Sequence, residues 1–203
     1  MNQMIKMNSI SEITTYMDDL RAIIFDLDDV LYPLETYVQS GFHQISWLFL
    51  GQGQAVYDQL WNAYVAERAE ARDRAALDAA VAGAVTTMLR AQGLYSDEMA
   101  EKCLCIFEQH RPGIQPYEGV VELLEQLRER GIRLGMIVDG LAEMQREKLR
   151  ALGIIPFFDE IIFTDDIAGH GDVRKFRKPN RICFEIMQLR LDVPFEKMGY
   201  VGD

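Results

Sequence analysis

Residues 21–32 read RAIIFDLDDVLY and combine an apolar run with a cluster of carboxylates. Residues 21–25 form a short run of β-branched and aromatic side chains, which is typical of a buried strand. The run ends abruptly in the carboxylates of Asp26, Asp28 and Asp29, so a polar loop follows it. The sequence therefore predicts an acidic loop at the carboxyl end of a buried strand, where α/β proteins place their ligands.

The chain beyond this strand has two regions that differ in periodicity. Residues 38–110 show helical periodicity, with breaks that leave room for about four helices. From residue 114 onward, helical segments alternate with short apolar segments. We expect helices over 118–130, 141–152 and 180–191, and strands over 132–138, 160–164 and 198–202. Such alternation predicts a parallel sheet covered by helices on both faces.

The predicted fold class is α/β, with a Rossmann-like parallel sheet core and an inserted all-helical domain. We assign residues 17–32 and 114–203 to the core, 33–113 to the helical insert and 1–16 to an N-terminal extension. The insert begins directly after the first strand. It is therefore expected to act as a cap that closes on a ligand and excludes water.

Composition narrows the possible partners and location. The formal net charge of -11 and a pI near 4.8 disfavour nucleic acid and anionic membrane surfaces, which would repel the protein. The three cysteines fit neither a zinc pattern nor a disulfide framework, and no apolar run has the length of a membrane span. We expect a cytoplasmic protein with no nucleic acid or membrane partner, and the sequence leaves its oligomeric state open.

The pair Asp26 and Asp28 is the first candidate site. Two adjacent carboxylates repel each other unless a cation or a proton compensates, and Mg²⁺ prefers such oxygens. A calcium EF-hand is excluded, because Leu31 stands where glycine is needed and Tyr37 where glutamate is needed. No glycine fingerprint of a dinucleotide site follows the strand. The pair alone leaves two alternatives open, a solvated acidic loop and a glycosyltransferase metal motif.

Four motifs occur together in a characteristic order: FDLDDVLY at 25–32, LGMIVDG at 134–140, RKP at 177–179 and YVGD at 200–203. With them the chain resembles the haloacid dehalogenase-like (HAD) hydrolase superfamily over essentially its whole length. The match is to subfamily I, whose helical C1-type cap lies between the first two motifs. The resemblance implies a Mg²⁺-dependent phosphatase that hydrolyses a small-molecule phosphate ester through an aspartyl-phosphate intermediate.

The resemblance also implies roles for individual residues. Asp26 corresponds to the nucleophile and Asp28 to the general acid and base, while Lys178 neutralises the nucleophile and the phosphate. Asp203 corresponds to a metal ligand, so Mg²⁺ would bind Asp26, Asp28 and Asp203. Members that cleave carbon–halogen bonds lack the second aspartate, so Asp28 favours phosphate chemistry over dehalogenation.

Two features depart from the family pattern. Val138 stands where the second motif has the Ser or Thr that binds the phosphoryl group, although Asp139 and Gly140 remain for phosphate binding through the backbone. The sequence ends at Asp203, where the family continues through a further acidic residue. An alternative is therefore a truncated or catalytically weak module with a binding or regulatory role in a longer protein. The physiological substrate cannot be read from the sequence.

Overall fold

The computed structural model describes residues 5–7, 19–68, 74–169 and 171–202. The chain divides into two compact units. The first, which we call the α/β unit, consists of Met1–Leu34 and Ile114–Asp203; the second, the helical unit, consists of Glu35–Gly113. The role of the helical unit as a cap stays a prediction.

The α/β unit is built on a parallel sheet, which the described residues form with five strands in the order β1-β5-β2-β3-β4. The strands are β1 Ile5–Met7, β2 Ala22–Phe25, β3 Arg133–Val138, β4 Glu160–Phe163 and β5 Met198–Val201. Since every pairing is parallel, the carboxyl ends of the strands lie at the same edge of the sheet. The predicted α/β class with a Rossmann-like core is confirmed.

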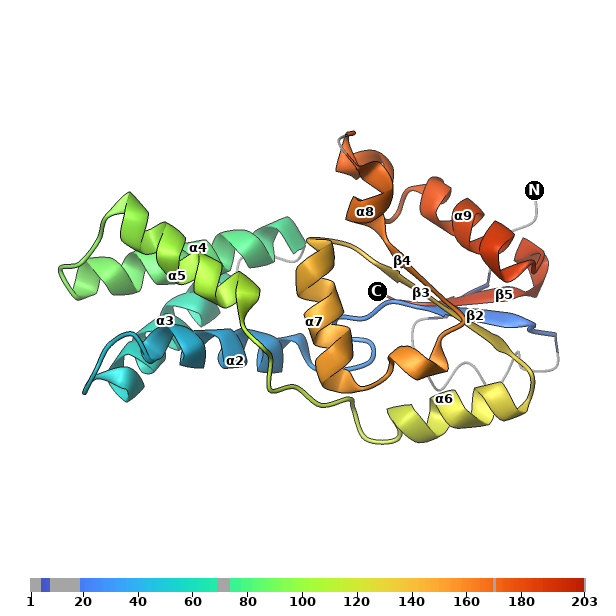
Figure 1. Ribbon diagram of the computed structural model, residues 1–203, viewed down its shortest axis with the longest axis horizontal. Helices are drawn as coiled ribbons and strands as arrows, with labels where there is room; N and C mark the ends of the chain where they lie inside the picture. Colours follow the sequence, from blue (N-terminus) through green and yellow to red (C-terminus); the bar gives the residue numbers. More distant parts are fainter. Residues whose placement is uncertain (1–4, 8–18, 69–73, 170, 203) are drawn as a thin grey trace. The chain divides into compact units, whose positions relative to one another are not determined.

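Helices cover both faces of this sheet, with α9 on one face and α6 on the other (Figure 1). The long helices of the unit are α6 Val120–Glu129, α7 Ala142–Leu152 and α9 Arg181–Leu191. Alternate residues of the strands, such as Ala22 and Ile24, form one core cluster with Met187 of α9. Gly135 of β3 allows this close packing, because a Cβ there would lie 2.8 Å from the Met187 sulfur.

Short helical segments complete the α/β unit. They are the 3-10 helices η2 Ile155–Phe157, η3 Val173–Lys175 and η4 Phe195–Lys197 and the short helix α8 Thr164–Ala168. The sequence predicted no helix between residues 164 and 180, but α8 begins directly after β4. Asp165 and Asp166 in its first turn favour a helix start, because carboxylates complement the N-terminal dipole.

Part of the predicted N-terminal extension belongs to the sheet. β1, at residues 5–7, pairs with β5 in parallel register, Ile5 opposite Gly199 and Met7 opposite Val201. Three residues are too short to show an alternating pattern, so no strand was predicted here. The other residues of the predicted extension lie outside the described part of the chain.

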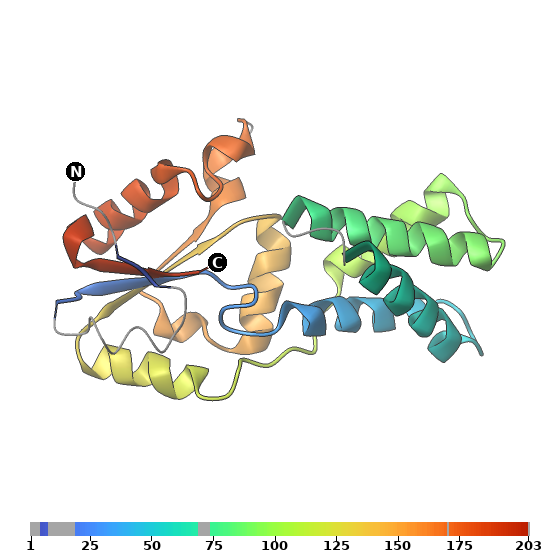
Figure 2. The same cartoon turned by 180° about the vertical axis from the view of Figure 1, so that it is seen from behind.

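The helical unit contains four helices among its described residues (Figure 2). They are α2 Leu34–Ser46, α3 Gly53–Arg68, α4 Arg74–Ala91 and α5 Asp97–Gln109. Aromatic rings fill its core, with Phe42 packed edge-on against Tyr64 and tilted against Phe107. Gly41 lies so close to α5 that a Cβ there would overlap the Phe107 ring. Where the chain leaves and re-enters the α/β unit, Tyr117 N–H donates to the Leu31 carbonyl at 2.9 Å.

No helix among the described residues combines the length and apolarity needed to cross a membrane.

Candidate active site

The strand ends bring together residues that are far apart in the sequence. Asp26 follows β2, Asp139 follows β3 and Thr164 follows β4. The Asp26 N–H donates to the carbonyl of Val201, the last residue of β5, at 2.9 Å. The carboxyl edge of the sheet therefore holds the first of the predicted catalytic residues beside Val201 of the fourth motif.

Asp26 and Lys178 form an ion pair at this edge. Lys178 Nζ lies 2.5 Å from Asp26 Oδ1 and also donates to the Ile137 carbonyl at 3.0 Å. Burial raises the pKa of Asp26, the Lys178 ammonium lowers it in part, and the nearby Asp28 carboxylate raises it further. The net direction is upward, because burial outweighs the effect of the Lys178 ammonium.

Asp139 connects three segments around the pair. Its carboxylate accepts a hydrogen bond from Thr164 Oγ1 at 2.8 Å and from the Lys178 N–H at 3.2 Å. Thr164 is fully buried and also donates to the Val138 carbonyl at 3.3 Å. The Asp139 side chain thus ties the end of β3 to β4 and to the segment that carries Lys178. Gly140 follows with φ 103°, a conformation that favours glycine.

The predicted phosphate-binding segment, Val138, Asp139 and Gly140, therefore lies at the same edge as Asp26. Val138 is buried at the end of β3. Its apolar side chain brings no hydroxyl to this strand end, so phosphate binding by this segment would depend on backbone N–H groups.

Asp28 is held by two residues that sequence reasoning did not assign. Lys148 Nζ donates to both of its carboxylate oxygens, at 2.8 and 3.1 Å, and the Tyr32 hydroxyl donates to Oδ1 at 2.5 Å. Tyr32 ends the FDLDDVLY motif, and the sequence predicted no role for it. Lys148 was missed because charged residues on an amphipathic helix are expected to face solvent. A usable signal existed, since Lys148 falls on the same stripe as Leu152.

The predicted metal ligands are only partly described. Asp26 and Asp28 lie in the described chain, but Asp203 lies outside it. Residues 5–7, 19–68, 74–169 and 171–202 contain no group of three or more His, Cys, Asp or Glu side chains that could hold a metal. The donors present nevertheless fit a hard divalent cation, because the Asp26 carboxylate and the Asp28 carbonyl both offer oxygen ligands.

Two arginines near Lys178 have acidic partners. Arg177 binds Asp165 through two hydrogen bonds, at 2.9 and 2.7 Å. Arg174 pairs with Asp172, which lowers the pKa of that carboxyl through the hydrogen bonds from Arg174. These arginines balance nearby carboxylates, as expected of solvated loop charges.

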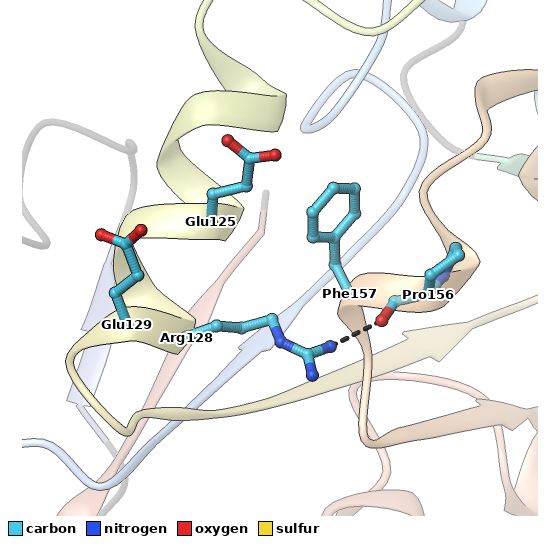
Figure 3. A pocket seen from close by; sticks show the side chains of 5 residues that line it. All are labelled: Glu125, Arg128, Glu129, Pro156 and Phe157. Atoms are coloured by element: carbon cyan, nitrogen blue, oxygen red, sulfur yellow. Dashed lines mark hydrogen bonds between the residues drawn. The ribbon is translucent and has the colours of Figure 1, made fainter.

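A pocket of about 450 Å³ lies elsewhere on the α/β unit, lined by Glu125, Arg128, Glu129, Pro156 and Phe157 (Figure 3). Arg128 Nη1 donates to the Pro156 carbonyl at 2.5 Å across it. Its lining comes from α6 and η2, which lead into the amino ends of β3 and β4. The pocket is therefore at the opposite edge of the sheet from Asp26 and contains none of the predicted site residues.

The sequence profile of the haloacid dehalogenase-like hydrolases matches residues 20–203. The chain belongs to this family. The match spans the acidic loop after β2, the strand end at Asp139 and the Lys178 segment in one alignment. The HAD-like hydrolase predicted from the four motifs is confirmed.

Several curated proteins resemble this HAD-like hydrolase in sequence. A glyceraldehyde 3-phosphate phosphatase of Methanocaldococcus jannaschii is 27% identical over 190 residues, which cover 91% of this chain and 76% of the relative. One from Methanopyrus kandleri is 41% identical over 90 residues, covering 44% of this chain and 36% of the relative. A pyrophosphatase PpaX of Halalkalibacterium halodurans is 29% identical over 111 residues, covering 52% and 48%.

Solved structures show the same fold. The HAD-hydrolase YfnB of Bacillus subtilis, bound to magnesium, has a TM-score of 0.58 and 20% identity, covering 91% of this chain and 78% of the other. The L-2-haloacid dehalogenase of Xanthobacter autotrophicus has a TM-score of 0.53 and 16% identity, covering 89% and 69%. The HAD-like hydrolase thus shares its architecture with proteins named for different activities, so the site must decide the chemistry.

Proposed function

We propose that this HAD-like hydrolase is a Mg²⁺-dependent phosphohydrolase that acts on a small phosphorylated metabolite through an aspartyl-phosphate on Asp26. The observation that carries the proposal is the Asp26–Lys178 pair at the strand ends, with the Asp28 carboxylate close by. The sequence relatives named as phosphatases support it. Asp28 also distinguishes this proposal from dehalogenation, which has no leaving oxygen to protonate.

In the first step an Asp26 oxygen attacks phosphorus, and the bond between phosphorus and the leaving oxygen breaks. Asp28, protonated at this point, gives its proton to that oxygen, so an alcohol departs. In the second step Asp28 takes a proton from water while the water oxygen attacks phosphorus. The bond to Asp26 breaks, phosphate leaves, and both aspartates return to their starting states.

The remaining residues position the phosphoryl group and neutralise negative charge. Lys178 balances the negative charge of Asp26 and of the phosphoryl group, and the backbone N–H groups of Asp139 and Gly140 bind phosphoryl oxygens. Asp26, the carbonyl of Asp28 and Asp203 would hold Mg²⁺. When bound, the ion supplies positive charge and a fixed template for the phosphate oxygens.

Hydrolysis of 4-nitrophenyl phosphate by the purified chain with Mg²⁺ tests the proposal, with an EDTA control and the Asp26→Asn variant. We expect turnover that disappears in both. Folded wild-type protein without Asp26-dependent turnover would contradict the proposal. It would favour the second candidate, a catalytically weak module, which the valine at position 138 supports.

A substrate panel then narrows the substrate class. Glyceraldehyde 3-phosphate and pyrophosphate are the first compounds to compare, because they are the substrates in the names of the relatives. 2-Chloropropionate serves as the control for dehalogenation. Chloride release without phosphate release would show that the role assigned to Asp28 is wrong.

A further inference from the structure

The Asp28 carboxylate is held by side chains to which the mechanism above gives no role. Lys148 donates to both carboxylate oxygens and Tyr32 donates to one of them. Lys148 and Tyr32 have no exposed surface, and the Asp28 side chain is 12% exposed. The arrangement therefore fixes a carboxylate at the edge of the site by contacts from the interior of the α/β unit.

The stability of the fold does not account for Lys148. Lysine is rarely buried completely, and a buried ion pair gives little net stability because desolvation offsets the attraction. An apolar side chain on the buried stripe of α7, beside Leu149 and Leu152, would stabilise the helix as well or better. Gln145, one turn earlier on this stripe, is also buried and donates to the Asp139 carbonyl at 3.0 Å. The buried face of α7 thus supplies polar groups to two strand ends.

We propose that Lys148 is a positioning residue that fixes the Asp28 carboxylate for proton transfer to and from the oxygens bonded to phosphorus, assisted by the Tyr32 hydroxyl. This inference rests on the proposed function. Hydrogen bonds to both oxygens restrict the rotation of the Asp28 side chain. A misplacement of about 1 Å at a reacting group can lower a rate by roughly a hundredfold.

Substrates with leaving groups of different basicity distinguish the positioning of Asp28 from a general structural role of Lys148. An alkoxide needs a proton as it leaves, whereas 2,4-dinitrophenolate does not. We therefore expect Lys148→Met to lower kcat/KM for ethyl phosphate by about ten- to a hundredfold, and that for 2,4-dinitrophenyl phosphate by less than about threefold. Both kcat/KM values report the steps up to and including formation of the aspartyl-phosphate. Equal losses with the two substrates would mean that Lys148 has a general structural role, and would overturn the proposal.

A double-variant cycle shows whether Lys148 acts through Asp28. Asp28→Asn should show the same dependence on the leaving group, and adding Lys148→Met to it should produce no further loss. Additive losses would contradict the inference. Arg150→Met, on the exposed side of the same helix, is the matched control and should leave kcat/KM unchanged for both substrates. Tyr32→Phe keeps the buried ring and should give a smaller loss of the same kind, so the test survives if Lys148→Met does not fold.

Failure of the proposed function is recognised separately. Wild-type protein without Asp26-dependent turnover would contradict that function whatever Lys148 does. A crystal structure of Lys148→Met then decides the inference, because we expect the Asp28 carboxylate to adopt a different rotamer. If Asp28 keeps its position in that structure, Lys148 does not position it and the inference is wrong.

Discussion

Val138 stands where the resemblance to the family predicts Ser or Thr, and its place at the end of β3 makes this position testable. A threonine has nearly the same shape and would add a hydroxyl donor next to Asp139. A donor aimed at the phosphoryl group stabilises a transition state by about 3 kcal/mol in comparable sites. We expect Val138→Thr to raise kcat for 4-nitrophenyl phosphate by at least about tenfold, measured at saturating substrate.

The control for this variant is Val138→Ala, which changes the volume of the side chain without adding a hydroxyl. It should not raise kcat. Equal turnover of Val138→Thr and the wild type would show that the hydroxyl does not reach the phosphate.

Cys183 of α9 gives the chain a pH-dependent stability at alkaline pH. Burial raises the pKa of the thiol to about 11, the charge of Asp139 adds to this, and Lys178 opposes it. In the unfolded chain the pKa of the thiol is about 8.5. The stabilisation is therefore complete below the unfolded pKa and is lost as the pH rises through the folded one. The loss is on the order of 3 kcal/mol.

Urea denaturation of the wild type and Cys183→Ala at about pH 8 and about pH 11 measures this effect. Other groups titrate in the same range, so the two proteins are compared by the stability that each loses between the two pH values. We expect the wild type to lose more stability than Cys183→Ala over this interval. An identical loss would show that the thiolate is not penalised in the folded chain.

The residues of the site differ in how far the sequence reveals them. Asp26, Asp28 and Lys178 stand out because each follows a strand or precedes a helix within a family motif. Their partner Lys148 has no such motif, and its role depends on a contact across 120 positions of sequence. Single-sequence patterns describe neighbours along one element, so they could not pair α7 with the loop after β2.

At the scale of elements, two helix glycines of the helical unit have opposite surroundings. A Cβ at Gly41 of α2 would overlap the rigid ring of Phe107, whereas one at Gly83 of α4 would meet the flexible end of Glu67 at 3.0 Å. Alanine gains about 1 kcal/mol over glycine in a helix, but overpacking costs about 1–3 kcal/mol. We expect Gly41→Ala to destabilise the unit and Gly83→Ala to be neutral or stabilising.

Urea denaturation, monitored by circular dichroism, gives the free energy of unfolding of both variants. Gly83→Ala is the matched control, since both substitutions make the same chemical change inside a helix. A gain of stability in both variants would show that α2 and α5 are not packed as closely as the structure has them.

The predictability of the elements follows the strength of their periodicity. β2 and β3 were predicted because each is a continuous apolar run between polar breaks, and α7 and α9 because their apolar residues recur at helical spacing. β1 was not predicted, because three residues carry no period and the pairing partner, β5, lies almost 200 residues away. The short helix α8 was missed for the same reason of length.

At the scale of the whole molecule, the charge of the chain and the charge of its site differ. The protein carries a formal charge of -11, yet the buried Lys148 and the partly buried Lys178 lie against the carboxylates at the strand ends. A phosphate ester would be repelled at long range and attracted only at short range. The composition predicts the long-range repulsion, and the fold identifies the lysines that lie beside the carboxylates.

The hydrogen bond between Tyr117 and Leu31 has a consequence for how such proteins diversify. It keeps the two ends of the intervening stretch side by side on the α/β unit, so that stretch behaves as an exchangeable cassette. Helices can be lengthened, shortened or replaced between these ends without altering the path of the strands. Evolution and the protein engineer can therefore vary the cassette while the segments that carry Asp26 and Lys178 stay intact.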